Sequence, residues 1–280
     1  MQYLRPTTFA DALAEKAARP EAVPIAGGTD LMVGLNRDAA PPPALLDLTA
    51  IEDLRSTANA GDSLWIGAGM TYAMIIDELH RLAPALAVAA RTVGSPQIRN
   101  RGTLGGNLGT ASPAGDMHPV LIATRATVVV ESVRGTRHIP IDDFYTGVKR
   151  NALAPDELIL AVRVPTGVGP QQFAKVGTRN AMVIAVCSVA VALDRRARTV
   201  GVGIGSAAAT PVRARGAEAL ASELPWKRGE LDEDLVRMFG EAVADASAPI
   251  DDHRGTAAYR RHALAVLARR ALAWAWSADR

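Results

Sequence analysis

Two Gly-Gly pairs, each set between apolar segments, constrain the fold of this chain more than any other feature. They lie in "PIAGGTDL" (24–31) and "RGTLGGNL" (101–108). A Gly-Gly pair lets the backbone adopt positive φ and approach a ligand closely, and consecutive N–H groups in such a turn form an anion-binding nest. The side chains of Thr29, Thr103 and Asn107 can add hydrogen bonds to phosphate. The sequence therefore predicts two loops that together hold the two phosphates of one dinucleotide.

Taken alone, each pair is more typical of an ordinary tight turn, because glycine marks turns so strongly. Neither matches the G-x-G-x-x-G fingerprint, and neither is a Walker A loop, which needs Lys followed by Ser or Thr. A third segment, "GAGMTYA" (67–73), begins like the fingerprint but lacks its last glycine. The nucleotide interpretation therefore depends on the two pairs acting together.

Apolar periodicity predicts a mixed order of helices and strands. In the first 165 residues we expect four helices: one over 7–18 capped by Thr7 or Thr8, a short one from Asp30, one over 73–92 with a break near Pro84, and a short one near His118. We expect single strands at Val23–Ala26, Ala44–Leu48 and Ser63–Gly67, a strand pair around a turn at Arg134-Gly135, and a strand ended by Pro165. Further on, two apolar strands over 172–193 and 199–215 flank the charged turn "DRRAR", and a helical tail follows. This order predicts an α+β fold rather than strict βαβ winding.

Composition excludes several classes of function. The 280 residues carry a formal net charge of +2, without the basic excess of a nucleic-acid-binding protein. The one cysteine, Cys187, provides neither a disulfide framework nor the ligands of an iron–sulfur cluster. The five histidines are scattered without metal-ligand spacing, so we expect no metal site. With no apolar leader at the start and no apolar run near the ~20 residues of a membrane span, we expect a cytoplasmic protein without a membrane span.

Three segments together carry a resemblance to a known family: "IAGGTDLMVGL" (25–35), "IRNRGTLGGNLGTASPAGD" (98–116) and "GSAAATPVRARGAEALASEL" (205–224). They closely resemble the FAD-binding medium subunit of molybdenum hydroxylases, the family of carbon monoxide dehydrogenase medium subunits and of the flavin portion of xanthine dehydrogenase. The likeness runs over nearly the whole chain. It implies an FAD-binding type-2 (PCMH-like) pair of α/β subdomains, 1–55 and 56–170, that enclose FAD. A C-terminal antiparallel sheet with helices, 171–280, like that of the CO dehydrogenase flavoprotein, would close over the flavin.

The resemblance also implies which residues contact the cofactor. The first FAD loop would consist of Pro24, Ile25, Ala26, Gly27, Gly28, Thr29, Asp30 and Leu31, and the second of Thr103, Leu104, Gly105, Gly106 and Asn107. Asp116 would hold a polar group such as a ribose hydroxyl, Ile159 would pack on the adenine or ribose side, Lys175 would lie near the isoalloxazine, and Val93 would form an apolar wall.

Some of these residues have simpler interpretations. Asp116 could cap the helix near His118, and Lys175 could be a solvated strand residue. Arg99 and Arg101 flank the second loop and could serve a partner surface or internal carboxylates rather than FAD.

By the same resemblance, the chain is an oxidoreductase subunit with non-covalent FAD, since neither loop has a histidine or cysteine to tether it. A large partner would carry the molybdenum cofactor and a small partner two 2Fe-2S clusters, in a heterohexamer with two copies of each subunit. The flavin would pass electrons to NAD⁺, oxygen or a quinone, and no residue of this chain would be a catalytic acid or base. Two alternatives stay open: a stand-alone FAD-dependent oxidoreductase with its own substrate pocket, and a flavin-free scaffold.

Overall fold

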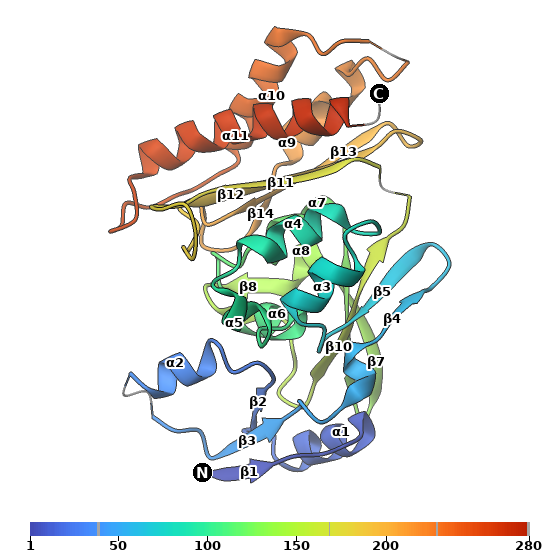
Figure 1. Cartoon of the computed structure of the whole chain (residues 1–280), viewed down its shortest axis with the longest axis vertical. Helices are drawn as coiled ribbons and strands as arrows, with labels where there is room; N and C mark the ends of the chain where they lie inside the picture. The colour runs from blue at the N-terminus through green and yellow to red at the C-terminus, as the bar shows by residue number, and fades with distance from the viewer. Residues whose placement is uncertain (38–39, 168, 228, 279–280) are drawn as a thin grey trace.

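The computed structural model describes residues 1–37, 40–167, 169–227 and 229–278, and its three larger sheets follow one another along the chain. In Figure 1 the N-terminal sheet lies at one end of the molecule, a middle part rich in short helices comes next, and the C-terminal sheet with its long helices forms the other end. Within the described ranges, no helix is both long and apolar enough to cross a membrane.

The first sheet is parallel, with the order β1-β3-β2. Its strands are β1 (Gln2–Leu4), β2 (Val23–Ile25) and β3 (Ala44–Asp47), joined by α1 (Phe9–Ala18) and α2 (Leu31–Leu35). Helix α1 begins after Thr8, whose hydroxyl accepts a hydrogen bond from the Asp11 N–H at 3.1 Å. The predicted helix and both predicted strands of this region are confirmed, and Asp30 stands at the start of α2.

The middle sheet has five antiparallel strands in the order β4-β5-β10-β6-β7. They are β4 (Thr57–Asn59), β5 (Ser63–Gly67), β6 (Thr127–Ser132), β7 (Gly135–Pro140) and β10 (Leu158–Pro165). The predicted β6–β7 turn is confirmed, with Ser132 paired to Gly135. Strand β10 is the last of the five in sequence, yet it lies between β5 and β6. The loop that precedes β10 therefore leads into the central strand of this sheet.

Short helices surround this sheet. They are the 3₁₀ turn Glu52–Arg55, α3 (Tyr72–Glu78), α4 (Pro84–Thr92), α5 (Pro96–Arg99), α6 (Leu104–Thr110), α7 (Met117–Ala123) and α8 (Ile141–Phe144), followed by the small strands β8 (Tyr145–Gly147) and β9 (Arg150–Asn151). The predicted break at Pro84 separates α3 from α4. The second Gly-Gly pair is not the predicted turn: Gly105 and Gly106 form the first turn of α6.

The C-terminal sheet runs β11-β12-β13-β14, all antiparallel. Its strands are β11 (Gln171–Val176), β12 (Cys187–Asp194), β13 (Thr199–Gly205) and β14 (Val212–Arg213). The predicted turn between Asp194 and Thr199 is confirmed. The single strand predicted over 172–193 is wrong, because the chain reverses between Val176 and Cys187, which pair with each other. The helical tail consists of α9 (Arg215–Ala219), a 3₁₀ turn (Leu220–Glu223), α10 (Glu233–Asp245) and α11 (Ala257–Ser277).

The buried side chains form two cores. One core runs through both the first and the middle sheet and includes Leu46, Ile66 and Phe144. The other lies between the C-terminal sheet and helices α10 and α11. The opposite face of the C-terminal sheet lies on α7: a Cβ at Gly203 would overlap the Pro119 carbonyl. Both faces are therefore covered, which explains why β12 is buried from Cys187 to Leu193. The boundaries at 55/56 and 170/171 stay predictions.

Candidate cofactor site

A cavity of about 750 Å³ lies between the first sheet and the middle part of the chain. Its volume falls within the roughly 300–1,000 Å³ of small-molecule sites. In Figure 1, α6 lies above β2 and α2, and residues of all three elements line the cavity. Its walls come from five main segments: 23–31, 48–55, 68–72, 100–110 and 149–159. The site is thus assembled from stretches far apart in the sequence.

The first predicted loop lies in this cavity along its whole length, from Pro24 to Leu31. Gly28 has φ of +72°, a conformation that favours glycine. In the described part of the chain, the N–H groups of Gly27, Gly28 and Thr29 donate no hydrogen bond. These three residues line the cavity, and consecutive free N–H groups are what an anion-binding nest requires.

The second predicted loop reaches the cavity differently. Thr103, Gly105, Gly106 and Asn107 line it, whereas Leu104 is fully buried behind it. The N–H groups from Leu104 to Gly106 are already used: Leu104 donates to the Met70 carbonyl at 3.0 Å, Gly105 to the Ala68 carbonyl at 2.8 Å and Gly106 to the Thr103 hydroxyl at 3.0 Å. The prediction of a second nest is therefore wrong, because these donors stabilise the start of α6.

The glycines of both motifs instead allow close packing. A Cβ at Gly105 would lie 2.7 Å from the Ala68 Cβ, and one at Gly27 would overlap the Arg101 carbonyl. The first loop thus rests directly on the backbone of the second motif. The two motifs form one wall of the cavity by contact between their backbones, whereas the sequence predicted two separate loops that each hold a phosphate.

Polar groups of the cavity extend beyond the predicted set. Asn107 Oδ1 is buried and has no partner among the described residues, so a donor from a ligand would satisfy it. Exposed Arg55, Arg101 and Lys149 bring positive charge to the rim. Only Arg101 of these three was a candidate from the sequence, because nothing in the local sequence marks Arg55 or Lys149.

Lys16 is a further cavity residue that the sequence did not indicate. It is buried on α1, and its Nζ donates to the Pro20 and Ala22 carbonyls at 2.8 and 2.7 Å. Burial lowers its pKa. The apolar part of the wall comes from Leu48, Ile51, Leu54, Leu153 and Ile159. Ile159 reaches the cavity because β10 occupies the centre of its sheet.

The remaining predicted residues, Val93, Asp116 and Lys175, meet at a second place outside the cavity lining. Lys175 Nζ donates to Asp116 Oδ2 at 2.6 Å and to the carbonyls of Thr92 at 2.8 Å and Val183 at 3.2 Å. Both charged side chains are 8% exposed, so Lys175 is not a solvated strand residue. Val93 follows Thr92 directly.

Asp116 stands at the start of α7 but makes no capping hydrogen bond, so that alternative is wrong. Burial raises the pKa of this carboxyl, although Lys175 acts in the opposite direction. Its Oδ1 atom is buried and has no partner among the described residues. Arg99 donates to the Val93 and Gly94 carbonyls rather than to a carboxylate.

The lining suits a negatively charged cofactor that also carries an apolar ring system. The free N–H groups and the cationic rim fit a pyrophosphate, and the apolar wall fits a ring system. The unpartnered Asn107 oxygen fits a donor group of such a ligand. FAD has all three kinds of group, so the residues present fit it.

Comparisons with known proteins agree with this class. Residues 1–167 match the family model described as FAD binding domain in molybdopterin dehydrogenase, and residues 172–275 match the CO dehydrogenase flavoprotein C-terminal domain. The chain is 31% identical to the xanthine dehydrogenase FAD-binding subunit of Escherichia coli O157:H7, over 99% of this chain and 96% of that protein. It is 30% identical to the carbon monoxide dehydrogenase medium chain of Hydrogenophaga pseudoflava, over 90% of this chain and 88% of that one.

The fold is shared as well. A solved structure of carbon monoxide dehydrogenase from Hydrogenophaga pseudoflava superposes with a TM-score of 0.90 at 29% identity, covering 99% of this chain and 97% of that chain. The chain therefore belongs to the family of FAD-binding medium subunits of molybdenum hydroxylases. It has the α+β fold expected from the resemblance, and it is an FAD-binding subunit of an oxidoreductase of the xanthine and carbon monoxide dehydrogenase type.

Proposed function

We propose that this subunit is the electron exit of its complex, taking electrons from 2Fe-2S clusters on a small partner and delivering them to NAD⁺, oxygen or a quinone. The observation that supports this most is the cavity itself, which offers binding groups rather than an acid–base pair. Its described lining contains no histidine or cysteine. Of its two carboxylates, Glu157 is held by Arg137, and Asp30 accepts a hydrogen bond from the Thr110 hydroxyl. When bound, FAD supplies the redox chemistry, and the protein supplies binding and orientation.

The residues of this chain then act by position and charge. The N–H groups of Gly27, Gly28 and Thr29 would bind the pyrophosphate, with Arg101 beside them. Ile159 and its apolar neighbours would exclude water from the adenine or ribose side. The absence of histidine and cysteine from the described lining supports a non-covalent mode of binding.

Asp116 and Lys175 would serve the same part of the cofactor. The family resemblance implies separate roles for them, with Asp116 near a ribose hydroxyl and Lys175 near the isoalloxazine. Because the two side chains are 2.6 Å apart, a cofactor group that reaches one also meets the other. We assign the pair to the isoalloxazine side, with the free Asp116 oxygen as acceptor and the ammonium as the positive charge.

The partners would be a large subunit with the molybdenum cofactor and a small iron–sulfur subunit, assembled as two copies of each of the three chains. This assembly and the cytoplasmic location stay predictions. They follow from the family relationship and from the sequence.

The relay can be tested in the complex reconstituted with wild-type chain or with a chain lacking FAD. The clusters are reduced anaerobically in both, and their reoxidation by an added acceptor is followed by the visible iron–sulfur bands. We expect rapid reoxidation only in the FAD-containing complex. Equal rates in both would contradict the relay, and turnover of a substrate by the isolated chain would favour a stand-alone oxidoreductase.

A further inference from the structure

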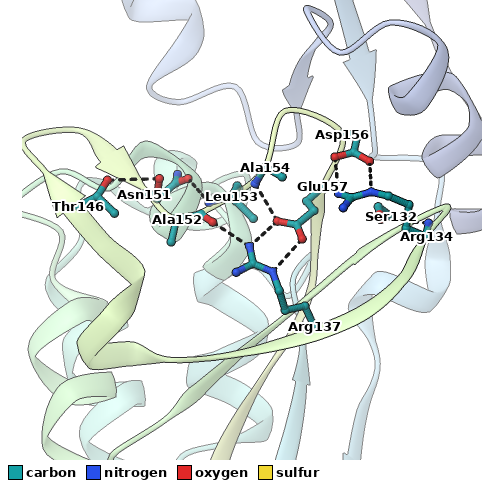
Figure 2. A network of polar contacts seen from close by, with 10 residues as sticks. All are labelled: Ser132, Arg134, Arg137, Thr146, Asn151, Ala152, Leu153, Ala154, Asp156 and Glu157. Carbon is teal, nitrogen blue, oxygen red and sulfur yellow. Dashed lines mark hydrogen bonds and ion pairs between the residues drawn. The ribbon is translucent and has the colours of Figure 1, made fainter.

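One wall of the cavity is a loop without regular secondary structure. It runs from Asn151, at the end of β9, to Leu158, at the start of β10, and most of its residues line the cavity. A loop of this kind needs external contacts to keep a fixed shape, because ordering each residue costs about 1–2 kcal/mol of conformational entropy. Figure 2 shows that the β6–β7 hairpin provides these contacts through two arginines.

Arg137 on β7 forms the inner contact. Its Nε and Nη2 donate to Glu157 Oε1 and Oε2 at 2.9 and 2.6 Å, and Nη2 also donates to the Ala152 carbonyl at 2.8 Å. One guanidinium therefore holds both ends of the loop. Such bidentate pairs combine strength with fixed geometry.

Glu157 is itself a cavity residue, and it is only 6% exposed. Besides the two bonds from Arg137, its Oε2 accepts a bond from the Ala154 N–H at 2.7 Å. The hydrogen bonds from Arg137 lower the pKa of this carboxyl. The Glu157 carboxylate thus holds the turn between Ala154 and Glu157 closed (Figure 2).

Arg134 forms the outer contact, a second bidentate pair with Asp156 at 2.9 and 2.7 Å. Arg134 is 62% exposed, and neither residue lines the cavity. The two pairs come from the same hairpin and hold adjacent residues of the same loop. They differ in that Glu157 belongs to the cavity lining and Asp156 does not.

The loop is also attached to the second glycine motif. Asn151 Nδ2 donates to the Gly109 carbonyl on α6 at 2.9 Å, and Asn151 Oδ1 accepts a bond from the Leu153 N–H at 3.2 Å. A displacement of the loop would therefore act on two walls of the cavity at once.

We propose that Arg137 and Glu157 are positioning residues for FAD. The pair fixes residues 152–158 in the shape that places Leu153 and Ile159 against the cofactor, and the Arg134–Asp156 pair only supports the loop from outside. This inference rests on the proposed binding of FAD in this cavity.

The test uses the full chain, in complex with its partner subunits if wild-type binding needs them. Equilibrium dialysis against FAD gives both the Kd and the number of sites per folded chain for Glu157→Gln, Arg137→Gln and the matched control Asp156→Asn. We expect the first two to raise the Kd about tenfold at one site per chain, the loss that corresponds to one charge-assisted hydrogen bond. Asp156→Asn should stay within about twofold of wild type.

The readouts separate positioning from mere stability. A structural role alone would reduce the number of sites and leave the Kd of the remaining sites unchanged, and that result would overturn the proposal. An equal loss in Asp156→Asn, or wild-type binding in Glu157→Gln, would also overturn it. If Glu157→Gln does not fold, the Kd of Arg137→Gln, a substitution on the exposed strand β7, tests the proposal instead. Failure of the wild-type chain to bind FAD would instead contradict the proposed function.

Discussion

At the scale of single residues, neighbouring glycines in the first loop have different reasons for being glycine. Gly28 needs its freedom of conformation, since its φ is +72°. Gly27 needs its lack of a side chain, because the Arg101 carbonyl occupies the space of a Cβ. The pair is visible in the sequence. The sequence does not indicate that Gly28 forms the turn and that Gly27 makes the contact with the second motif.

We predict that Gly27→Ala destabilises the folded chain by about 1–3 kcal/mol, the range of overpacking a tight site. The free energy of unfolding in urea measures it. Gly34→Ala on α2 is the control, because nothing lies within 4 Å of its added Cβ. A Gly27→Ala variant as stable as wild type would show that the two motifs do not pack as described.

The buried pair of Asp116 and Lys175 gives a second prediction. Lys175→Met leaves a buried carboxylate without its cation and should cost about 3–5 kcal/mol. The double variant Asp116→Asn with Lys175→Met removes both charges and should recover part of this loss. Urea unfolding of the two single variants and the double variant tests it, and additive losses would argue against a coupled pair.

At the scale of elements, local pattern located several strands, but it missed the chain reversal between Val176 and Cys187 and misplaced the second glycine pair in a turn. The strand predicted at Ser63–Gly67 is observed at those residues. Gly105 and Gly106 were expected in a turn because glycine marks turns so strongly. Here the hydroxyl of Thr103 caps α6, and contact with Ala68 requires a residue without a side chain. That tertiary contact outweighs local propensity.

The composition of the site could be predicted only in part for a similar reason. The glycine motifs were visible as local patterns, and the resemblance to a family supplied Ile159 and Lys175. Lys16 and Arg55 could not be found, because they reach the cavity through sheet order and helix packing. The position of β10 between β5 and β6 likewise depends on long-range strand pairing, which no local pattern encodes.

The loop before α11 provides a pH prediction. Asp252 accepts bonds from the N–H groups of Arg254 at 2.8 Å and Gly255 at 3.3 Å and from Arg260 Nη2 at 2.5 Å. The Arg254 N–H, the largest favourable cause, helps lower its pKa to about 2 from the ordinary 3.8. Because the folded pKa is lower, the carboxylate stabilises the fold above pH 3.8, and this contribution is lost as the pH falls toward 2.

Asp252→Asn should therefore be less stable than wild type at pH 7, by about 1–2 kcal/mol. The difference should shrink between pH 3.8 and 2, as measured by unfolding in urea across this range. Asp245→Asn, an exposed position on α10, is the control. A difference independent of pH would mean that the charge of Asp252 does not carry the effect.

At the scale of the whole molecule, the C-terminal part is joined to the rest through both packing and charge. Phe173, Ala190 and Ala192 belong to the core of the first two sheets. Asp142 on α8 pairs with Arg213 at 3.0 Å and Arg215 at 2.9 Å. We therefore predict a single calorimetric unfolding transition for the isolated chain, with equal calorimetric and van't Hoff enthalpies. Two resolved transitions would show that the C-terminal part unfolds independently.

The central claim, that FAD occupies the cavity lined by the two glycine motifs, is tested most directly by the flavin content of Gly106→Val. A Cβ at Gly106 meets only the Thr103 hydroxyl at 3.0 Å, so the added methyls would enter the cavity rather than the protein core. Gly216→Val on α9, where a Cβ meets nothing within 4 Å, is the matched control. FAD released on denaturation is measured by its visible absorption. The account predicts full flavin in wild type and Gly216→Val and almost none in Gly106→Val, and full flavin in a folded Gly106→Val would contradict it.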